Sequence, residues 1–448
     1  MKIAVLGGGG FRVPMVYGAL LARGGQLGLD EVTLYDVDAA RTARIQPVLT
    51  GLERELCTRL PLRATDSLED AVEGADFVFC AIRVGRLEGR VVDERVPLDE
   101  GVVGQETTGP GGICFALRTV PVMLEVARVV AERAPAAWLI NFTNPAGLVT
   151  EAVQEVLGGR AIGICDTPSA LCRRAAEALG RAPDELWFDY FGLNHLGWLR
   201  GVYDGDRNLL PDLLADDSLL DTVEEGRLFG GDWLRSLGMI PNEYLYFYYF
   251  ASDTVGAIKS GLESRAEFLL RQQTAFYESD GRTPEEALAA WRAVRAEREE
   301  TYFEEARTAA GVAGHSANWQ DVGGYEGEAM AVVEAIALNR RRVLILDTAN
   351  RSGLPFLDEH AVVEVPCIVG GAGAVPTAVG DVPGHARALI ETIKEVERTA
   401  IRAAVTGSRQ LAVQALALHP LVPSVTTARR IFDAYASRQP ELAARFGS

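Results

Sequence analysis

The first 165 residues alternate short apolar runs with segments of helical periodicity, and this alternation constrains the fold more than any other feature. The first run is KIAVLG, residues 2–7, and more glycines follow it at once. The later runs are EVTLYDVD, ADFVFCAI, AAWLINFTNP and AIGIC. Strands separated by helices predict parallel βαβ units with right-handed crossovers, so we expect an α/β fold with a Rossmann-type doubly wound parallel sheet at the N-terminus. Ligands bind such a sheet at the carboxyl ends of its strands.

Beyond about residue 170 the pattern changes. Long helical stretches cover residues 282–308 and 386–446, and the runs RRVLILDTAN and AVVEVPCIV between them resemble strands. This predicts an α+β C-terminal half packed against the first. We expect one domain over residues 1–168 and a second over 169–448. Because this boundary falls beside Cys165, the residue is expected at a cleft.

Composition excludes several classes of protein. Of the 448 residues, 48% are apolar and 24% charged, which is typical of a globular chain. The net charge of −18, with no basic stripe, argues against a nucleic-acid or anionic-membrane partner. The six cysteines form no CxxC pair, and neither a signal peptide nor an apolar run of membrane length is present. We expect a soluble, reduced, cytoplasmic protein.

The glycines of LGGGGFRVP follow the first strand and precede a helix, which is the context of a dinucleotide-binding turn. Gly7 and Gly9 fit the GxGxxG pattern, but Arg12 occupies its last position. By itself this is equally typical of a simple tight turn. Asp36, at the end of the second strand, strengthens the nucleotide interpretation, because an acid there binds an adenosine ribose and favours NAD over NADP.

The segment from Ile82 to Gly112 is long, glycine-rich and charged, so it is either a functional loop or a solvated insertion. Its arginines could hold an anionic or polyhydroxyl ligand through planar bidentate contacts; they are Arg83, Arg86 and Arg90. Glu106 lies in GQETTGPGG, a stretch without a strand or helix pattern.

Three further motifs place chemical groups near strand ends, and each has a plain alternative. Asn144 in NFTNP and Asp166 in GICDTP could be N-caps of the helices that follow. Cys165 could be a small buried hydrophobic residue. His195 in FGLNHLGW could be structural, and it is too far along the chain from Cys165 to form a local metal motif. Pairing these two residues requires the fold.

Taken together and in order, these motifs resemble glycoside hydrolase family 4. The resemblance is carried by CAIRVG, GQETTGPGG, NFTNPAGLVT, GICDTP, GLNHLGW, IPNEYLYFYY and VVEVPCIVGGAGAVPTAVGDVP, and it covers essentially the whole chain. Within the family the arrangement is most similar to 6-phospho-β-glucosidases. It implies a C-terminal domain like that of lactate and malate dehydrogenases, an enzyme using NAD and a divalent metal, usually Mn²⁺, a phosphorylated glycoside as substrate, and a homodimer or homotetramer.

The resemblance also implies roles for single residues. The metal ligands would be Cys165 and His195. The general acid would be Asp166 and the catalytic base Tyr244, with Tyr246, Tyr248 and Tyr249 as alternatives for the base. Glu106 matches the glutamate that raises the basicity of that tyrosine. Substrate contacts would come from Arg90, Asn144 and Arg265. Cofactor contacts would come from Gly7, Gly9, Gly10, Asp36 and Arg83.

These residue types suit an elimination mechanism. The C2 proton of a sugar is too weakly acidic to remove, but oxidation of C3 by NAD⁺ places it alpha to a carbonyl. A metal held by a thiolate and an imidazole would stabilise the enolate; the same pair would suit zinc, so Mn²⁺ rests on the resemblance. A tyrosinate would take the C2 proton and Asp166 would protonate the leaving oxygen. Water then adds, and the retained NADH reduces C3 again.

Two segments depart from the family. Members with phosphorylated substrates often carry Ser, Tyr or Thr after the first glycines, where this chain has FR; we expect Arg12 to bind phosphate, the alternative being an unphosphorylated glycoside. The segment of residues 314–327 also differs, and its His315 is expected to be structural. Two other classes stay open: an NAD-dependent dehydrogenase of a sugar or hydroxy acid, which would accumulate NADH, and a nucleotide sensor without catalysis.

Overall fold

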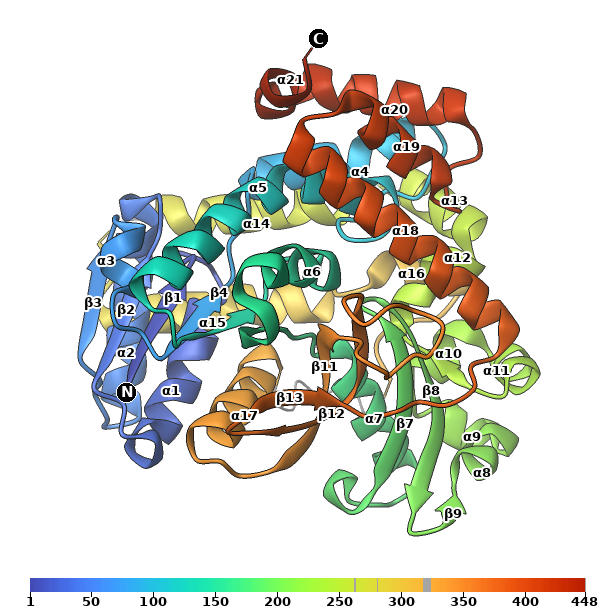
Figure 1. The fold of residues 1–448 in the computed structure, drawn as a ribbon, viewed down its shortest axis with the longest axis horizontal. Helices are drawn as coiled ribbons and strands as arrows, with labels where there is room; N and C mark the ends of the chain where they lie inside the picture. The colour runs from blue at the N-terminus through green and yellow to red at the C-terminus, as the bar shows by residue number, and fades with distance from the viewer. Residues whose placement is uncertain (262, 280, 317–323, 448) are drawn as a thin grey trace.

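The computed structural model describes residues 1–261, 263–279, 281–316 and 324–447 (Figure 1). Within these ranges, thirteen strands form one sheet with the path β10-β8-β7-β12-β11-β6-β5-β4-β1-β2-β3, while β9 pairs with β8 and β13 with β12. Part of the divergent segment, residues 317–323, lies outside the described residues. None of the described helices is both long and apolar enough to cross a membrane.

The N-terminal half of the sheet is parallel. Its strands are β1 (Lys2–Leu6), β2 (Glu31–Tyr35), β3 (Leu62–Thr65), β4 (Phe77–Cys80), β5 (Trp138–Asn141) and β6 (Ala161–Gly163). They lie in the order 3-2-1-4-5-6, which is the strand order of a dinucleotide-binding Rossmann fold. The predicted doubly wound sheet is confirmed.

Helices cover both faces of this parallel half because its strands are apolar on both sides. In β1, Ile3 and Val5 face one core cluster, and Ala4 and Leu6 face the other. The first cluster includes α1 (Val13–Leu27) and α2 (Ala39–Glu55). The second includes α5 (Pro110–Arg133), α6 (Ala146–Leu157) and the long C-terminal α18 (Gly384–Thr406), which Figure 1 shows across the upper part of the molecule.

The other half of the sheet is antiparallel and confirms the predicted α+β character. Its strands are β7 (Trp187–Leu193), β8 (Leu196–Asp204), β9 (Arg207–Asn208), β10 (Ile240–Pro241), β11 (Arg342–Ala349), β12 (Val362–Gly370) and β13 (Gly373–Pro376). The two strand-like runs of the sequence are β11 and β12. The halves join where Gly163 of β6 pairs with Asp347 of β11. Because the sheet continues through this point, the boundary at residue 168 stays a prediction.

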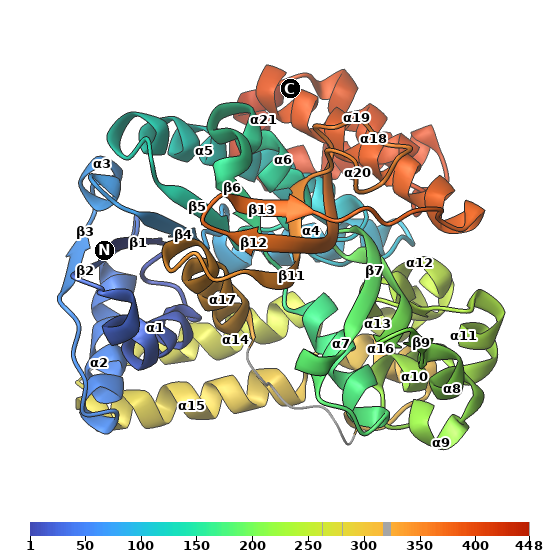
Figure 2. The same ribbon diagram turned by 60° about the horizontal axis from the view of Figure 1, so that its bottom comes forward.

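The remaining helices surround the sheet. They are α3 (Leu68–Val72), α4 (Arg86–Asp99), α7 (Thr167–Ala178), α8 (Leu210–Ala215), α9 (Asp217–Leu220), α10 (Glu224–Phe229), α11 (Gly231–Leu237), α12 (Tyr246–Tyr249), α13 (Ala251–Ser260), α14 (Arg265–Glu278), α15 (Pro284–Glu300), α16 (Glu304–Ala310), α17 (Tyr325–Ala337), α19 (Arg409–Leu418), α20 (Val425–Arg438) and α21 (Pro440–Phe446). Figure 2 shows α14 and α15 crossing the N-terminal half, where α15 contacts α2. The segment 82–112 is therefore no simple loop, since it contains α4.

Candidate active site

A cavity of about 1550 Å³ runs from the glycine turn after β1 to the ends of β5 and β6. Its lining includes most of the residues singled out from the sequence: Gly7, Gly10, Arg12, Asp36, Arg83, Arg90, Glu106, Asn144, Asp166, Tyr244 and Arg265. Gly9, Cys165 and His195 do not line it; the last two lie just beneath its wall, 3% and 5% exposed. The fold thus collects segments that are far apart in sequence around one space.

The nucleotide end of the cavity is defined by backbone geometry. Gly7 has φ +88°, and a Cβ atom added there would lie 2.7 Å from the carbonyl oxygen of Ala81. The Gly10 N–H donates to the Gly7 carbonyl oxygen at 2.8 Å, which closes the turn before α1. Only glycine fits position 7 without strain. A dinucleotide-binding turn has the same requirement, because its backbone must approach the diphosphate closely. The cradle therefore fits a dinucleotide.

Asp36 ties this turn to the end of β2. Its carboxylate accepts hydrogen bonds from the N–H groups of Gly9 at 2.8 Å and Asp38 at 2.9 Å. From the other side, the Tyr277 hydroxyl of α14 donates to the Gly9 carbonyl oxygen at 2.8 Å, and the Arg41 guanidinium stacks on the Tyr277 ring. The nucleotide end is thus enclosed by residues from both halves of the chain.

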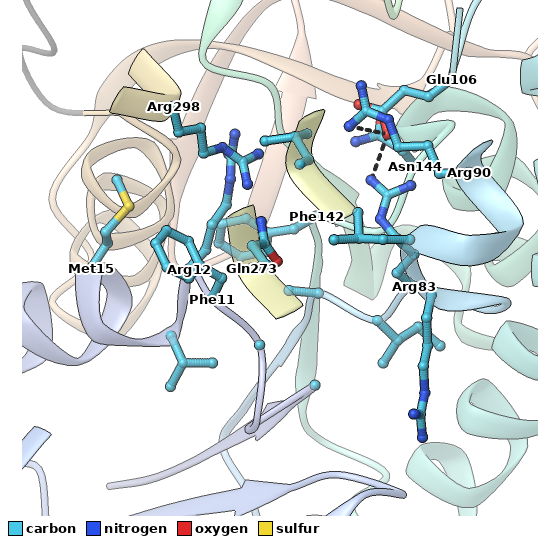
Figure 3. A pocket seen from close by; sticks show the side chains of 18 of the residues that line it. Phe11, Arg12, Met15, Arg83, Arg90, Glu106, Phe142, Asn144, Gln273 and Arg298 are labelled. Atoms are coloured by element: carbon cyan, nitrogen blue, oxygen red, sulfur yellow. Dashed lines mark ion pairs between the residues drawn. The ribbon is translucent and has the colours of Figure 1, made fainter. Parts of the chain in front are cut away.

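A buried arginine and glutamate group forms the middle of the cavity (Figure 3). Glu106 Oε2 lies 2.6 Å from Arg83 Nη2 and 3.0 Å from Arg90 Nη1. Burial raises the pKa of Glu106, but the two arginines outweigh burial and hold it at about 2. Arg83, expected to contact the cofactor, is thus grouped with the residues expected to contact substrate. Asn144 lies beside this group, and its Oδ1 is buried with no hydrogen-bond partner among the described residues.

Asn144, Cys165 and Asp166 follow the ends of β5 and β6, and the structure shows whether the first and last of them cap helices. The N-cap of α6 is Pro145, so Asn144 is not a capping residue. Asp166 does occupy the N-cap position of α7, but its side chain accepts no capping hydrogen bond, and it lines the cavity. Cys165 is buried immediately before it. Burial, followed by the charges of Glu364 and Asp166, raises the pKa of the Cys165 thiol well above its ordinary value. A bound cation would reverse this effect.

His195 is presented by a tight hairpin between β7 and β8. Asn194 and His195 form its two-residue turn, and His195 has φ +61°, an uncommon conformation for a residue other than glycine. The turn is fixed because Asn194 Oδ1 accepts the N–H of Ala146 at 3.2 Å. His195 Nδ1 is hydrogen-bonded to Thr107 Oγ1 at 2.8 Å. Burial lowers the pKa of His195 to about 3, so the imidazole is neutral at physiological pH.

Tyr244 lies directly against His195. The two rings are parallel with centroids 3.6 Å apart, and the charges of Cys165 and Glu106 both act on the tyrosine. Burial, with the charge of Glu243, raises the pKa of Tyr244 well above 10. Its backbone is fixed by Asn242, whose Oδ1 accepts the Tyr244 N–H at 3.0 Å.

The three alternative tyrosines have other neighbours. Tyr246 stacks on Phe250, Tyr248 packs against His419, and the Tyr249 hydroxyl accepts a hydrogen bond from the indole N–H of Trp198. None of the three lines the cavity as described. The geometry therefore favours Tyr244.

The donor atoms near Tyr244 fit a divalent metal whose remaining coordination positions are filled by substrate or water. His195 Nε2 is buried and has no hydrogen-bond partner in the described part of the chain, while Nδ1 is held by Thr107. This is the arrangement of a metal-binding imidazole. No cluster of three or more His, Cys, Asp or Glu side chains able to hold a metal occurs in the described ranges. Cys165 and His195 would therefore leave coordination positions for substrate or water.

Sequence patterns missed several neighbours of these residues. The Tyr302 hydroxyl lies 3.2 Å from that of Tyr244 and donates to Glu243 Oε1 at 2.9 Å. Burial raises the pKa of Glu243 to about 8, although Arg174 opposes the effect. No motif marks Tyr302. Thr107, by contrast, stands next to Glu106 and could have been noticed.

His315, expected to be structural, lines the cavity, and its ring is hydrogen-bonded to the chain. Its Nε2 is hydrogen-bonded to the carbonyl oxygens of Glu299 and Glu300, both at 3.1 Å, and its Nδ1 lies 3.5 Å from a carboxylate oxygen of Glu224.

Comparison with known proteins identifies the family. Residues 2–181 match the family described as family 4 glycosyl hydrolase, and residues 190–422 match the family 4 glycosyl hydrolase C-terminal domain. A Bacillus subtilis protein named "Probable 6-phospho-beta-glucosidase" is 32% identical over 97% of this chain and 95% of its own. Maltose-6'-phosphate glucosidase of the same organism is 31% identical over 96% and 94%.

Solved structures agree. The 6-phospho-β-glucosidase of Thermotoga maritima with NAD and glucose 6-phosphate superposes with a TM-score of 0.82 at 27% identity, over 99% of both chains. A 6-phospho-α-glucosidase from gut microorganisms with NAD and Mn²⁺ gives 0.80 at 26% identity, over 97% of both. The predicted fold class and enzyme class are confirmed. Because both family models match, over residues 2–181 and 190–422, the chain belongs to the family 4 glycosyl hydrolases.

Proposed function

We propose that this enzyme hydrolyses 6-phospho-β-glucosides with NAD and a divalent metal, Mn²⁺, as resident cofactors. One observation carries the proposal: Tyr244, stacked on His195 beside Cys165, borders the same cavity as the glycine turn. In an elimination that begins with oxidation of C3, the nucleotide accepts the hydride, the metal stabilises the enolate and the base removes the C2 proton, so the three groups must share one cavity. A simple dehydrogenase has no leaving oxygen and needs no acid to protonate one. A nucleotide sensor needs neither a base nor metal ligands.

When bound, NAD supplies a hydride acceptor for C3, and the metal supplies a Lewis acid for the resulting carbonyl. Tyr244 Oη takes the C2 proton as a phenolate, which a metal ion held by the neutral His195 and the Cys165 thiolate would stabilise against the effect of burial. Asp166, on the cavity wall next to Cys165, protonates the leaving oxygen. Glu106, held ionised by Arg83 and Arg90, places negative charge near Tyr244 and so raises the basicity of its phenolate.

The substrate contacts are Arg90, Asn144, Arg265 and, for the phosphate, Arg12. Asn144 suits a sugar hydroxyl because its Oδ1 is buried and unpartnered among the described residues. The named relatives include both 6-phospho-β- and 6-phospho-α-glucosidases, so the β preference is the part of this proposal that assays must decide. The second candidate substrate is an unphosphorylated glycoside, hydrolysed by the same mechanism. It stays open because Arg12 occupies a position where phosphate-binding members often carry small hydroxyl residues.

The enzyme is further proposed to be a cytoplasmic homodimer or homotetramer. Support for assembly comes from three apolar side chains in one row across the β11–β12–β13 edge. Val343 pairs with Ile368 and Ile368 with Val375, and these residues are 52%, 47% and 43% exposed. Replacing Ile368 by glutamate should dissociate the oligomer if this row is covered by a second copy, which light scattering would show. The six free thiols suit a reducing compartment.

The deciding assay measures aglycone release from p-nitrophenyl α- and β-glucosides, with and without a 6-phosphate, in D₂O with NAD⁺ and Mn²⁺. The proposed route gives a product with deuterium at C2, because the proton on Tyr244 exchanges with solvent before water adds. It needs only catalytic NAD⁺ and accumulates no NADH. If no label appears, loss of label from a C2-deuterated substrate checks for a base shielded from solvent. Aglycone release without NAD⁺ or metal would refute the proposal.

The role of Arg12 has its own test. Arg12→Ala should raise KM for a 6-phosphoglucoside much more than it lowers activity on the unphosphorylated sugar. Equal effects on both substrates would assign Arg12 to the nucleotide or to the fold.

A further inference from the structure

Arg298 belongs to a helix that packs on the nucleotide-binding half. In α15, Trp291 Nε1–H donates to the Phe11 carbonyl oxygen at 2.9 Å, and the two rings pack 5.9 Å apart. Leu288, Trp291, Arg295 and Arg298 follow one another at helical spacing and share one face. The first two are buried, and the two arginines line the cavity. The docking of α15 therefore directs Arg298 toward the bound ligands.

The Arg298 guanidinium has mostly cationic neighbours. The largest charges acting on it are, in decreasing order, those of Arg12, Arg265, Arg90 and Glu106, and Glu106 is itself engaged in two ion pairs. Burial and these arginines lower the pKa of Arg298 well below its ordinary value. In the ranges that the structure describes, no carboxylate forms an ion pair with Arg298. The folded chain thus concentrates positive charge at this point.

The other two arginines are more fully engaged. Arg265 donates to the carbonyl and hydroxyl oxygens of Thr301 and to the Arg298 carbonyl oxygen. Arg90 pairs with Glu94 at 2.7 Å and with Glu106. Among the described residues the Arg298 guanidinium has no comparable partner, and its planar donor fork suits an anion.

Figure 3 shows the side chains of Arg12 and Arg298 reaching into the same part of the cavity from different elements. Arg12 immediately precedes α1, next to the glycine turn. Given the function proposed above, we infer that Arg298, together with Arg12, binds a phosphate group of a ligand. Two ligands of this enzyme carry that chemistry: the substrate, through its 6-phosphate, and NAD, through its diphosphate.

The test compares dissociation constants of the intact enzyme. Calorimetry measures NAD⁺ binding, then the binding of glucose 6-phosphate and of glucose with NAD⁺ and Mn²⁺ present. Arg298→Gln should weaken one phosphate ligand by about tenfold or more and leave glucose unchanged. Arg298→Lys should recover part of the loss, because the charge returns without the fork. Loss confined to glucose 6-phosphate assigns the 6-phosphate, and loss of NAD⁺ assigns the diphosphate.

Arg292→Gln is the matched control, since Arg292 lies on the same helix, pairs with Glu55 of α2 and is half exposed. It should change no dissociation constant. The inference is overturned if Arg298→Gln leaves both phosphate ligands within twofold of wild type, or weakens glucose and glucose 6-phosphate equally. If the wild-type enzyme binds neither NAD⁺ nor glucose 6-phosphate, the proposed function itself fails.

Discussion

The two ends of the cavity are built in different ways. At the nucleotide end, the glycine turn and Asp36 belong to one short stretch, from Gly7 to Asp36, in which no side chain may crowd the backbone, although α14 also encloses this end. The metal end is formed by side chains from three separate segments, Cys165, His195 and Tyr244. The first should therefore be sensitive to an added methyl group, and the second to the loss of a single functional atom. The predictions below test this contrast.

Loss of a metal ligand should have the largest effect. Cys165→Ser and His195→Ala should each lower kcat by more than about 100-fold if these residues hold the metal, because no group of three or more potential ligands occurs in the described ranges and changes even to the surroundings of metal ligands cost about 10–100-fold. NAD⁺ affinity should stay within a few-fold, since the glycine turn lies at the other end. Steady-state kinetics and calorimetry measure both quantities. Near-wild-type turnover of either variant in chelator-treated buffer would contradict the metal assignment.

Removing the proposed base should lower kcat to a comparable extent. Tyr244→Phe deletes one oxygen and keeps the ring on His195, so kcat should fall by about 10²–10⁴-fold while the thermal midpoint changes little. Tyr246→Phe, Tyr248→Phe and Tyr249→Phe are the controls and should retain activity. If one of these three loses activity while Tyr244→Phe keeps it, the base has been assigned to the wrong tyrosine.

At the nucleotide end, an added methyl group should have a moderate effect. Gly7→Ala forces a non-glycine residue to φ +88° and places Cβ 2.7 Å from a carbonyl oxygen, which costs about 1–3 kcal/mol of backbone strain. NAD⁺ affinity should fall by about tenfold.

Gly25→Ala is the control for that change, because no atom lies within 4 Å of the added Cβ on α1. It should raise the free energy of unfolding by about 0.5–1 kcal/mol and leave NAD⁺ binding unchanged. Equal effects of the two substitutions on NAD⁺ binding would remove the contrast between the two ends.

A last prediction concerns the pH dependence of stability. Burial raises the pKa of Glu243 to about 8, so the folded chain holds a proton that the unfolded chain releases near pH 4.5. This contribution to stability is complete below pH 4.5 and is lost as pH rises toward 8, at up to about 1.4 kcal/mol per pH unit. Glu243→Gln keeps an acceptor for Tyr302 and removes the titration. Urea unfolding at pH 5, 6.5 and 8 should show a flatter profile for the variant; parallel profiles would contradict the pKa.

Local order explains what the sequence could predict. Within a single βα unit, residues that are close in sequence are also close in space. This made it possible to predict the glycine turn, Asp36 and the strand-end position of Cys165 and Asp166. His195 and Tyr244 are different, because a hairpin and a 3₁₀ turn (Glu243–Leu245) bring their rings to 3.6 Å. Only the family resemblance joined them to Cys165 in advance.

The helix α4 was not predicted because it buries charge. Helices are recognised by an apolar stripe, but Arg90, Asp93 and Glu94 are among the buried residues of α4, and Gly89 and Pro97 interrupt the pattern further. Arg298 escaped notice for a related reason, since it lies in a run of arginines and glutamates that reads as a solvated surface. Buried charged side chains do not contribute to the apolar periodicity by which helices are recognised. The structure is therefore needed to show which of them line a cavity.

The hydrogen bonds from Tyr277 and Trp291 to the carbonyls of the glycine turn also bear on how the protein is made. The turn leaves the ribosome well before the helices that enclose it, because these helices follow more than 250 residues later in the chain. Until α14 and α15 have been synthesised, the nascent chain therefore lacks both of these hydrogen bonds. The enclosed form of the turn exists only in chains that have been synthesised through α15.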